Sequence, residues 1–234
     1  TLTELNRQLR PHGLMFTPDP STASRATVGG AMGNNSCGAH SIIYGKTVDH
    51  VLGQDVVLSN GNIANFENVV GSDLEAKLRV EGLEGDIYRT VRDVAARSAP
   101  LVEANFPKVL RRVGGYNLDL VNEPDGVNLA QLMVGSEGTL AAVTSARLNL
   151  VKIPEFTGLA VLHFKALDEA MEATVATLEH EPSAVEHIGA IIITQARRHL
   201  LFSRNLGFLQ GEPTDILVVE FNGGSLAEID DKFD

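Results

Sequence analysis

The chain has 234 residues, 44% of them hydrophobic, which is enough for one large domain or two small ones with an ordinary buried core. Its 30 acidic and 19 basic residues give a formal net charge of −11, so we expect neither nucleic acid nor an anionic membrane as a direct partner. The single cysteine excludes an internal disulfide, and no Cys/His cluster has zinc spacing, so we expect a cytoplasmic location and no metal site. No apolar run reaches the roughly 18 residues of a membrane span, so any membrane association is expected to come through partners.

The first 13 residues predict an amphipathic helix that is already under way where the chain begins. Leu2, Leu5 and Leu9 share one stripe, and a proline and a glycine close behind them end the helix. Because the chain opens inside a helix and has no initiator methionine, we expect an internal fragment of a longer protein. Pro18 and Pro20 then predict an extended segment of turns.

Residues 51–66 predict a β-hairpin, because apolar and polar residues alternate on both sides of Asn60-Gly61, a pair typical of turns with positive φ. A helix is predicted over residues 86–99. Its apolar face, which we expect to pack on a sheet, consists of Ile87, Val91, Val94 and Ala95.

A short helix is predicted up to Met133, followed by a glycine-bounded turn and a strand. The even-numbered residues of that strand predict its buried face: Leu140, Ala142, Ala146, Leu148 and Leu150. Beyond Pro154 the pattern changes, which predicts a second unit. Its expected elements are a strand over 158–164, a helix over 167–180, a helix opened by the capping box Ser183-Ala-Val-Glu186, a strand over 215–223 and a short helix from Ser225.

The most informative stretch is ATVGGAMGNNSCGAHSIIYGKTV, residues 26–48, which has five glycines and no acidic side chain in an otherwise acidic chain. A pyrophosphate needs converging backbone N–H groups, glycines that allow close approach and positive φ, and no neighbouring carboxylate. The glycines and short donors that meet these needs are Thr27, Gly29, Gly30, Gly33, Asn34, Asn35, Ser36 and Gly38. Tight turns at a crowded sheet edge explain the spacing equally well.

A second glycine turn, GSEGTL over residues 135–140, lies between a predicted helix and a predicted strand. It exposes backbone amides for a ligand or for its own closure. Glu137 is a poor neighbour for a phosphate, so we expect it to accept hydrogen bonds from loop N–H groups or from ribose hydroxyls. Neither stretch has the spacing of a Rossmann fingerprint or a Walker loop, so a nucleotide would be bound in another way.

Taken together, these motifs resemble the FAD-linked oxidases of the vanillyl-alcohol-oxidase (PCMH) type. The family's flavin segment is similar to GLMFTPDPSTASRATVGGAMGNNSCGAHSIIYGKTVDHVLGQDVVLSNG. Its G-Y-x-L segment is similar to RRVGGYNLDL, and its G-S-E-G-T-L element is similar to LMVGSEGTLAAVTSARLNLVKIP. Within the family, the likeness is to the branch of glycolate-oxidase subunits and D-2-hydroxyacid dehydrogenases.

The resemblance implies an α+β fold with a PCMH-type FAD-binding domain. Residues 1–13 would be a helix from the end of the first FAD subdomain, and residues 14–153 the second subdomain, a mainly antiparallel sheet flanked by helices. Residues 155–234 would begin an α/β ferredoxin-like cap domain. The family's first phosphate loop and its catalytic histidines have no counterpart here, so we expect the catalytic residues outside this chain. The implied partners are the N- and C-terminal parts of the parent enzyme, with an iron–sulfur domain or subunit left open.

The implied cofactor is FAD. Residues 18–27 match the stretch that passes the isoalloxazine and pyrophosphate, residues 29–38 the turn beneath the cofactor, and residues 135–140 the turn near its ribose and adenine. The residues expected to contact FAD are Pro18, Asp19, Pro20, Ser21, Ser24, Thr27, Gly29, Gly30, Asn34, Asn35, Ser36, Cys37, Gly38, Gly135, Glu137, Gly138, Thr139 and Leu140.

Some single residues have two explanations. Cys37 is either a small buried side chain or a thiol packed against or bonded to the flavin. His40 is either a loop residue that tolerates a turn or a contact to cofactor or substrate. Tyr116 either buries its ring in the core or points its hydroxyl at the active site, where it would meet the substrate.

The nearest thing to a basic patch is Lys108, Arg111 and Arg112, which is enough to hold one small anion. Both arginines are either solvated charges or receptors for a substrate carboxylate, and Arg111 is our substrate candidate. The histidines of the last third show no mutual ligand spacing and predict surface positions or helix packing: His163, His180, His187 and His199.

We therefore expect part of an FAD-dependent dehydrogenase that oxidises a small-molecule D-2-hydroxy acid such as lactate, glycolate or 2-hydroxyglutarate, with hydride transfer to flavin N5. Two alternatives stay open at this point. One is a non-redox phosphate- or nucleotide-binding module, and the other is an inactive structural fragment that cannot hold FAD alone.

Overall fold

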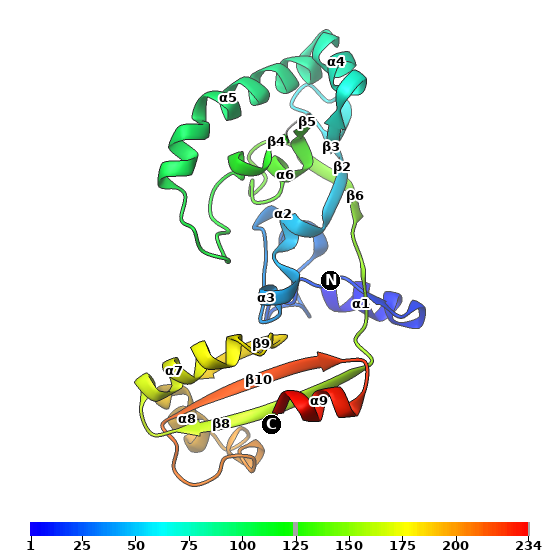
Figure 1. Ribbon diagram of the computed structural model, residues 1–234. Helices are drawn as coiled ribbons and strands as arrows, with labels where there is room; N and C mark the ends of the chain where they lie inside the picture. Colours follow the sequence, from blue (N-terminus) through cyan, green and yellow to red (C-terminus); the bar gives the residue numbers. More distant parts are fainter. Residues whose placement is uncertain (124–125, 234) are drawn as a thin grey trace. The chain divides into compact units, whose positions relative to one another are not determined.

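The computed structural model describes residues 1–123 and 126–233 (Figure 1). The chain divides into two compact units, Thr1–Lys152 and Ile153–Asp234. Each unit combines helices with antiparallel sheet, which confirms the predicted α+β class. The roles of FAD subdomain and cap that we assigned to these parts of the chain stay predictions.

The main sheet of the first unit, in the described part of the chain, has five antiparallel strands in the order β4-β5-β3-β2-β6. Its strands are β2 Val51–Val57, β3 Ile63–Val70, β4 Asn122–Glu123, β5 Gly126–Asn128 and β6 Ala142–Leu148. The predicted hairpin is confirmed as β2 and β3. Its turn contains Gly61 at φ 84°, and the Asn60 side chain accepts a hydrogen bond from the Asn62 N–H at 3.0 Å.

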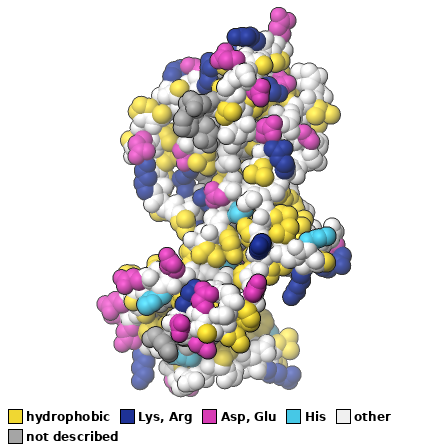
Figure 2. Space-filling view, turned by 45° about the vertical axis from the view of Figure 1, so that its right-hand side comes forward, with side chains coloured by type: hydrophobic (Ala, Val, Ile, Leu, Met, Phe, Trp, Pro, Cys, Tyr) yellow, Lys and Arg dark blue, Asp and Glu magenta, His cyan; other side chains and the backbone are white. Residues whose placement is uncertain are grey.

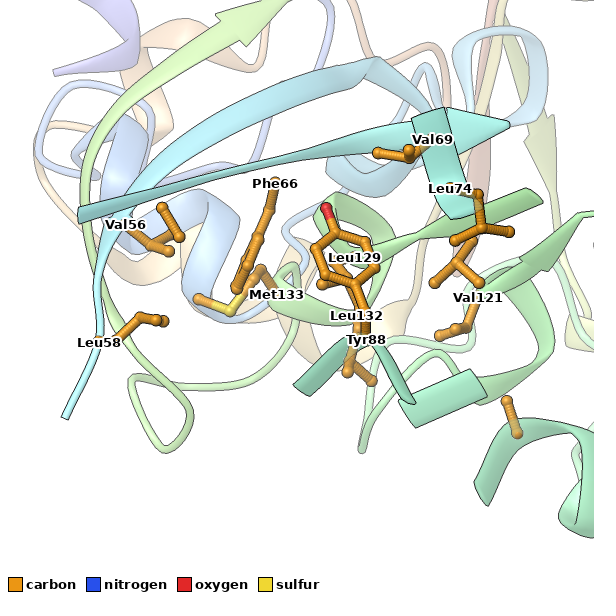
Figure 3. Packing of buried hydrophobic residues seen from close by; sticks show 13 residues of the cluster. Val56, Leu58, Phe66, Val69, Leu74, Tyr88, Val121, Leu129, Leu132 and Met133 are labelled. Atoms are coloured by element: carbon orange, nitrogen blue, oxygen red, sulfur yellow. The ribbon is translucent and has the colours of Figure 1, made fainter. Parts of the chain in front are cut away.

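The largest core cluster lies between this sheet and the helices α4 Gly71–Arg79, α5 Leu83–Asn105 and α6 Leu129–Met133 (Figure 3). The helix predicted over residues 86–99 is therefore confirmed but longer at both ends. Ile87, Val91 and Ala95 pack on the cluster as predicted. Tyr88, which we had not placed in the core, is fully buried there and meets Phe66 edge to face at 6.2 Å.

The strand β6 differs from its prediction. Ala142 and Ala146 were expected on a buried face but are exposed. Two physical reasons account for this: β6 is an edge strand, and its pairing with β2 contains irregularities that interrupt the alternation of faces. Only toward its end does the pattern recover, since Leu148 packs against Val48 and Val51.

The N-terminal helix is confirmed as α1 Leu2–Leu9, with Gly13 at φ 69° just beyond the short 3₁₀ turn Arg10–His12. The expectation that this helix is already under way at the first residue is wrong, because Thr1 is its N-cap and accepts a hydrogen bond from the Glu4 N–H at 3.2 Å. Its leucine stripe packs against Phe16 and Ala31. Two-residue strands, β1 Leu14–Met15 and β7 Val151–Lys152, then pair antiparallel and bring both ends of the first unit together.

The second unit has a three-stranded sheet in the order β8-β10-β9, where β8 is Phe156–Phe164, β9 Ala184–Ile188 and β10 Asp215–Gly223. β10 is antiparallel to both neighbours, so β8 and β9 run parallel. This split βαβ arrangement is that of a ferredoxin-like fold. The helices α7 Leu167–Leu178 and α9 Leu226–Phe233 pack on the sheet (Figure 1). The third α-helix of this unit in the described residues is α8 Ala190–Arg198.

The capping box predicted at Ser183 to Glu186 is wrong, because residues 184–188 form the strand β9. Ser183 instead fastens this strand to β10: its N–H donates to the Glu220 carbonyl at 2.7 Å and its hydroxyl donates to the Glu220 carboxylate at 2.8 Å. The helix begins later, at Ala190, directly after Gly189. The other predicted elements of this unit are confirmed, including the strand over residues 215–223.

None of the helices in the described residues combines the length and the apolar character needed to cross a lipid bilayer. On the face shown in Figure 2, basic side chains lie singly among acidic ones.

Candidate functional site

The glycine-rich stretch folds into short helices rather than an open loop. Thr27 caps α2 Val28–Gly33 by accepting a hydrogen bond from the Gly30 N–H at 3.0 Å. The helix ends with Asn35 in the left-handed region at φ 53° and with the Ser36 N–H bonded to the Ala31 carbonyl at 2.9 Å. The stretch continues as α3 Ser41–Tyr44 and the 3₁₀ turn Thr47–His50.

The prediction that the four glycines at 29, 30, 33 and 38 supply positive φ is wrong, because none of them lies in that region. The helical backbone of α2 has no need of it. Positive φ in this stretch falls on Asn35, as predicted for an asparagine, and on Gly45.

The second glycine turn is hydrogen-bonded to the end of α2. The Gly135 N–H donates to the Met32 carbonyl and the Glu137 N–H to the Gly33 carbonyl, both at 2.9 Å. Gly135, Glu137 and Gly138 have φ of 85°, 53° and 73°, which lets the turn double back on itself. Two of its amides thus serve the turn's attachment to α2, and the two predicted motifs lie side by side.

Where they meet there is a pocket of about 380 Å³, within the usual size range of ligand pockets. It is lined by Gly29, Met32, Gly33, Gln54, Met133, Ser136, Gly138, Ala141, Ala142 and Val143. No acidic side chain is among these lining residues. Gly29, Gly33 and Gly138 are sequence-predicted site residues, and the structure brings them together although more than 100 positions separate the first from the last.

The pocket glycines face open space. A Cβ atom built on Gly29, Gly33 or Gly138 would meet no atom of the chain within 4 Å. These glycines are therefore not required for the chain's own packing at that point, and a side chain there would occupy the room a ligand needs.

Sequence analysis missed Gln54, which is 2% exposed and lines the pocket from β2. Its Nε2 donates to the Ala130 carbonyl at 3.0 Å, while its Oε1 is buried without a hydrogen-bond partner in the described part of the chain. The sequence did contain one signal that could have indicated Gln54: it is a polar residue at an inward-facing position of the predicted hairpin strand, opposite Phe66. The sequence did not distinguish the apolar wall residues of the pocket from ordinary core residues: Met32, Met133 and Val143.

Asp19, Gly38 and His40 form a second cluster. The Asp19 carboxylate accepts a hydrogen bond from His40 Nδ1 at 2.5 Å, and its other oxygen is buried without a partner among the described residues. A Cβ on Gly38 would come within 2.2 Å of the Asp19 carbonyl oxygen. Gly38 therefore allows close packing on Asp19, and the carboxylate of this segment is held against the protein.

Two asparagines of the 26–48 stretch accept hydrogen bonds from within it. Asn35 is fully buried, and its Oδ1 accepts a hydrogen bond from the Val48 N–H at 2.9 Å. The Ser36 hydroxyl donates to the exposed Asn34 side chain at 2.6 Å. Cys37 is half-buried and free. Contacts of these residues with FAD stay predictions.

The remaining predicted residues differ in exposure. Ser21, Ser24, Glu137, Thr139 and Leu140 are exposed, and Pro18 is buried with Pro20 half-buried. The Glu137 carboxylate makes no hydrogen bond within the described residues, which leaves ribose hydroxyls as its predicted donors. None of the residues 18–24 lines the pocket.

Tyr116 does not bury its ring in the core, since it is 41% exposed. Its hydroxyl lies 2.8 Å from Thr139 Oγ1, which itself donates to the Ser136 carbonyl at 2.5 Å. Because Thr139 has one hydroxyl proton, Tyr116 is the donor of the pair. The Tyr116 oxygen thus keeps its acceptor capacity beside the second glycine turn.

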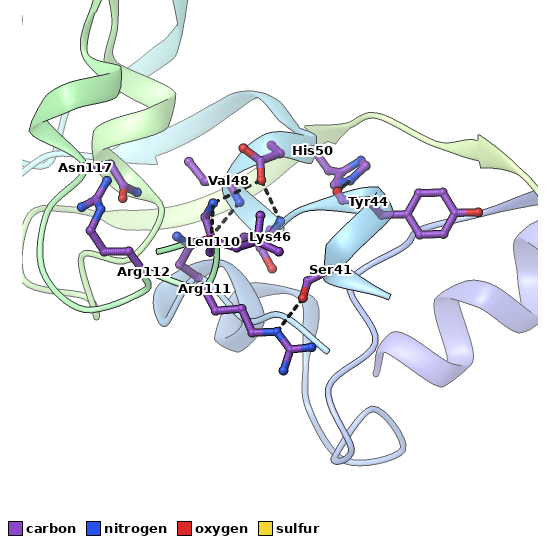
Figure 4. A network of polar contacts seen from close by, with 12 residues as sticks. Ser41, Tyr44, Lys46, Val48, His50, Leu110, Arg111, Arg112 and Asn117 are labelled. Atoms are coloured by element: carbon purple, nitrogen blue, oxygen red, sulfur yellow. Dashed lines mark hydrogen bonds and ion pairs between the residues drawn. The ribbon is translucent and has the colours of Figure 1, made fainter. Parts of the chain in front are cut away.

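In the predicted small-anion cluster, Arg112 and Lys108 are paired with carboxylates. Arg112 binds the Asp119 carboxylate at 2.6 Å and Lys108 binds Glu103 at 2.8 Å. Arg111 Nε donates to the Ser41 hydroxyl at 2.7 Å, and Lys46 donates to the Leu110 carbonyl at 3.3 Å (Figure 4). These contacts hold the 108–112 segment against α3, and substrate binding by Arg111 stays a prediction.

No group of three or more side chains that could hold a metal ion occurs among the described residues. His187 lies on β9, where its Nε2 is 2.8 Å from the buried Asp215 carboxylate. The Thr214 hydroxyl, and after it His187, lowers the pKa of Asp215. His199 stacks on Phe202 with ring centroids 4.3 Å apart.

Comparison with known proteins shows what the chain is similar to. Residues 1–67 match the family described as FAD binding domain. Among solved structures, two of alkyldihydroxyacetonephosphate synthase superpose on the whole chain with TM-scores of 0.59 and 0.60 at 16% identity, and the chain covers 35% of each. That likeness concerns the fold.

Curated relatives narrow the assignment. The chain is 32% identical to the D-2-hydroxyglutarate dehydrogenases of Pseudomonas putida and Escherichia coli, over 98% of its own length and 23% of theirs. It is 29% identical to the glycolate oxidase subunit GlcD of Bacillus subtilis over 72% of its length and 25% of that protein. These matches confirm the resemblance, and the chain spans about a quarter of these relatives' length.

The residues around the pocket fit part of an FAD molecule. Three glycines leave open space, the lining carries no carboxylate that would repel a pyrophosphate, and Gln54 presents a buried acceptor without a donor. FAD contains both hydrogen-bond donors on its adenine and ribose and a flat ring system suited to apolar walls.

Proposed function

We propose that the chain supplies one wall of the FAD site in a dehydrogenase that oxidises a D-2-hydroxy acid, such as lactate, glycolate or 2-hydroxyglutarate. The observation that carries the proposal is the acid-free pocket between α2 and the second glycine turn. Both walls come from motifs that match the flavin family, and the relatives' names supply the substrate class.

We place the adenine and ribose half of FAD in this pocket. Met32, Met133 and Val143 offer apolar surface for a flat ring, and Ser136 and Gln54 offer polar groups at its edge. Glu137 lies exposed at the turn, within a backbone that bends toward α2, and is placed to accept from ribose hydroxyls.

The pyrophosphate is proposed to leave the pocket along the glycines of α2. The chain's net charge of −11 makes a carboxylate-free surface necessary there. The nearby Asp19 is compatible with this, because its carboxylate is bonded to His40 and packed on Gly38.

Bound FAD supplies acceptance of a hydride equivalent at its N5 atom. The chain's own residues bind and orient the cofactor, and their backbone dipoles are in place before the reaction. Tyr116, with acceptor capacity left on its hydroxyl, and Arg111, held by Ser41, are our candidates for contact with the substrate.

The catalytic acid–base residues are proposed to lie in parts of the parent enzyme outside this chain. The second unit is proposed to begin the cap domain. We propose a cytoplasmic location on the basis of the sequence composition. An iron–sulfur domain or subunit as a partner is proposed from the family resemblance.

The test is to express the protein from its complete reading frame and to identify any bound flavin after heat release. We expect FAD, and reduction of the bound flavin by at least one of D-lactate, glycolate and D-2-hydroxyglutarate. Protein that binds ADP but neither contains nor takes up FAD would contradict the proposal and favour a non-redox nucleotide-binding module.

A further inference from the structure

We propose that Gln54 determines base specificity in the pocket, by accepting a hydrogen bond at Oε1 from the 6-amino group of a purine ring. The inference rests on the proposed function, because that purine is then the adenine of FAD. It concerns a residue of β2 that sequence analysis did not assign to the cofactor site.

The orientation of the Gln54 amide is fixed by its other end. Nε2 donates to the Ala130 carbonyl at 3.0 Å, and a carbonyl oxygen can only accept. The nitrogen must therefore face Ala130, and the oxygen must face away from it. Ala130 is fully buried in α6 and Gln54 is 2% exposed, so solvent does not compete for this bond.

Oε1 then lacks a donor in the described part of the chain. Leaving a buried acceptor unpaired is costly, and native structures rarely do so without a partner from outside the chain. Gln54 lines the pocket, and we assign the missing hydrogen bond of Oε1 to an N–H group of the ligand that enters it.

The shape of the pocket selects the kind of donor. Met32, Met133, Ala141 and Val143 give it apolar walls, against which thioethers and methyl groups pack well on an aromatic ring. A flat ring with an amino group at its edge satisfies both the walls and Oε1. Adenine has such a group at position 6, whereas hypoxanthine has an oxygen there, which would face Oε1 as a second acceptor.

The experiment compares ADP with IDP by isothermal titration calorimetry on the flavin-free protein. Because one mismatched buried hydrogen bond is at stake, we expect ADP to bind about tenfold more tightly than IDP. In Gln54→Met, which keeps the length and removes the acceptor, the preference should fall to about twofold or less.

Gln131→Met is the matched control. Gln131 also donates through Nε2 to a backbone carbonyl, that of Val48 at 3.1 Å, but it does not line the pocket. This variant should lose a comparable amount of stability and keep the preference for ADP.

Equal binding of ADP and IDP by the unaltered protein would overturn the inference without needing any variant, as would an undiminished preference in folded Gln54→Met. Binding of neither nucleotide would also overturn it. Weaker binding of 2′-deoxy-ADP together with equal ADP and IDP affinities would assign Oε1 to a ribose hydroxyl instead. The proposed function fails separately, when the protein takes up no FAD.

Discussion

The two ends of the glycine-rich stretch use glycine for opposite purposes. At Gly29 and Gly33 the position of a Cβ is empty to 4 Å, and these residues line the pocket. At Gly38 and Gly45 the same position is filled, by Asp19 at 2.2 Å and by the Asp49 carboxylate at 2.3 Å. The comparison teaches that glycine content alone does not mark a binding surface: the first pair leaves room for a ligand, and the second lets the chain pack on itself.

The largest effect is expected at the packed end. Gly38→Ala places a methyl group against the backbone of Asp19, which cannot move without displacing the 18–25 segment, and should lower the free energy of unfolding by about 3 kcal/mol. Urea denaturation measures this.

Gly29→Ala is the control for that substitution, since it is the same change in open space within α2. It should leave stability unchanged or raise it by about 0.5 kcal/mol, as alanine favours helix over glycine. Equal destabilisation by Gly38→Ala and Gly29→Ala would contradict the distinction between the packed and the open end of the glycine-rich stretch.

Asn35 is expected to give the next effect. Asn35→Ala removes the acceptor of the Val48 N–H and puts alanine at φ 53°, so we expect a loss of about 2 kcal/mol in urea denaturation. The neighbouring Asn34→Ala removes an exposed contact with Ser36 and should cost no more than about 0.5 kcal/mol. Equal losses would show that Asn35 does not fasten α2 to the 47–50 turn.

The smallest effect on stability is expected for Asp55. This residue follows Gln54 in β2 but lies on the exposed side of the strand, whereas Gln54 is buried and lines the pocket. The Ser145 hydroxyl, and after it the Asn65 amide, lowers the pKa of Asp55 on the exposed side of β2. Its contribution is therefore present above the unfolded-state pKa of about 4 and is lost as the pH falls through the lower folded pKa.

Asp55→Asn should consequently reduce thermal stability slightly at pH 7 and by progressively less as the pH is lowered below 4, and it should leave FAD affinity unchanged. A stability difference that grows toward low pH would contradict the sign. A loss of FAD affinity would show that the exposed side of β2 also contributes to the site.

Much of the fold could be predicted because its signals are local. The hairpin follows from Asn60-Gly61 and strand alternation, and α5 from an apolar face at helical spacing. The failures are equally physical. The Ser183 hydroxyl, predicted to cap a helix, instead bonds Glu220 on the neighbouring strand, and the sequence pattern does not distinguish the two uses. In β6 the irregular pairing at the sheet edge interrupts the alternation of faces on which the prediction depended.

The site was predictable only in part. The sequence motifs indicated both glycine turns, since their composition is unusual, but the pocket exists because backbone bonds from Gly135 and Glu137 join them at α2. Gln54 was missed because a single polar residue in a strand does not by itself indicate a binding site. Only the structure shows that its Nε2 is bonded to the Ala130 carbonyl and that its Oε1 has no partner among the described residues.

The central claim, that the pocket beside α2 holds part of FAD, is tested most directly by filling it. FAD affinity is to be measured by flavin fluorescence titration for the protein from its complete reading frame and for Gly33→Leu and Gly207→Leu. Gly207 also has no atom within 4 Å of a built Cβ, but it belongs to the second unit and does not line the pocket.

We predict that Gly33→Leu keeps its folding stability to within about 1 kcal/mol and loses FAD affinity by at least about tenfold, because the side chain occupies ligand space. Gly207→Leu should bind FAD as the unaltered protein does. Equal FAD affinity in all three proteins would contradict the account.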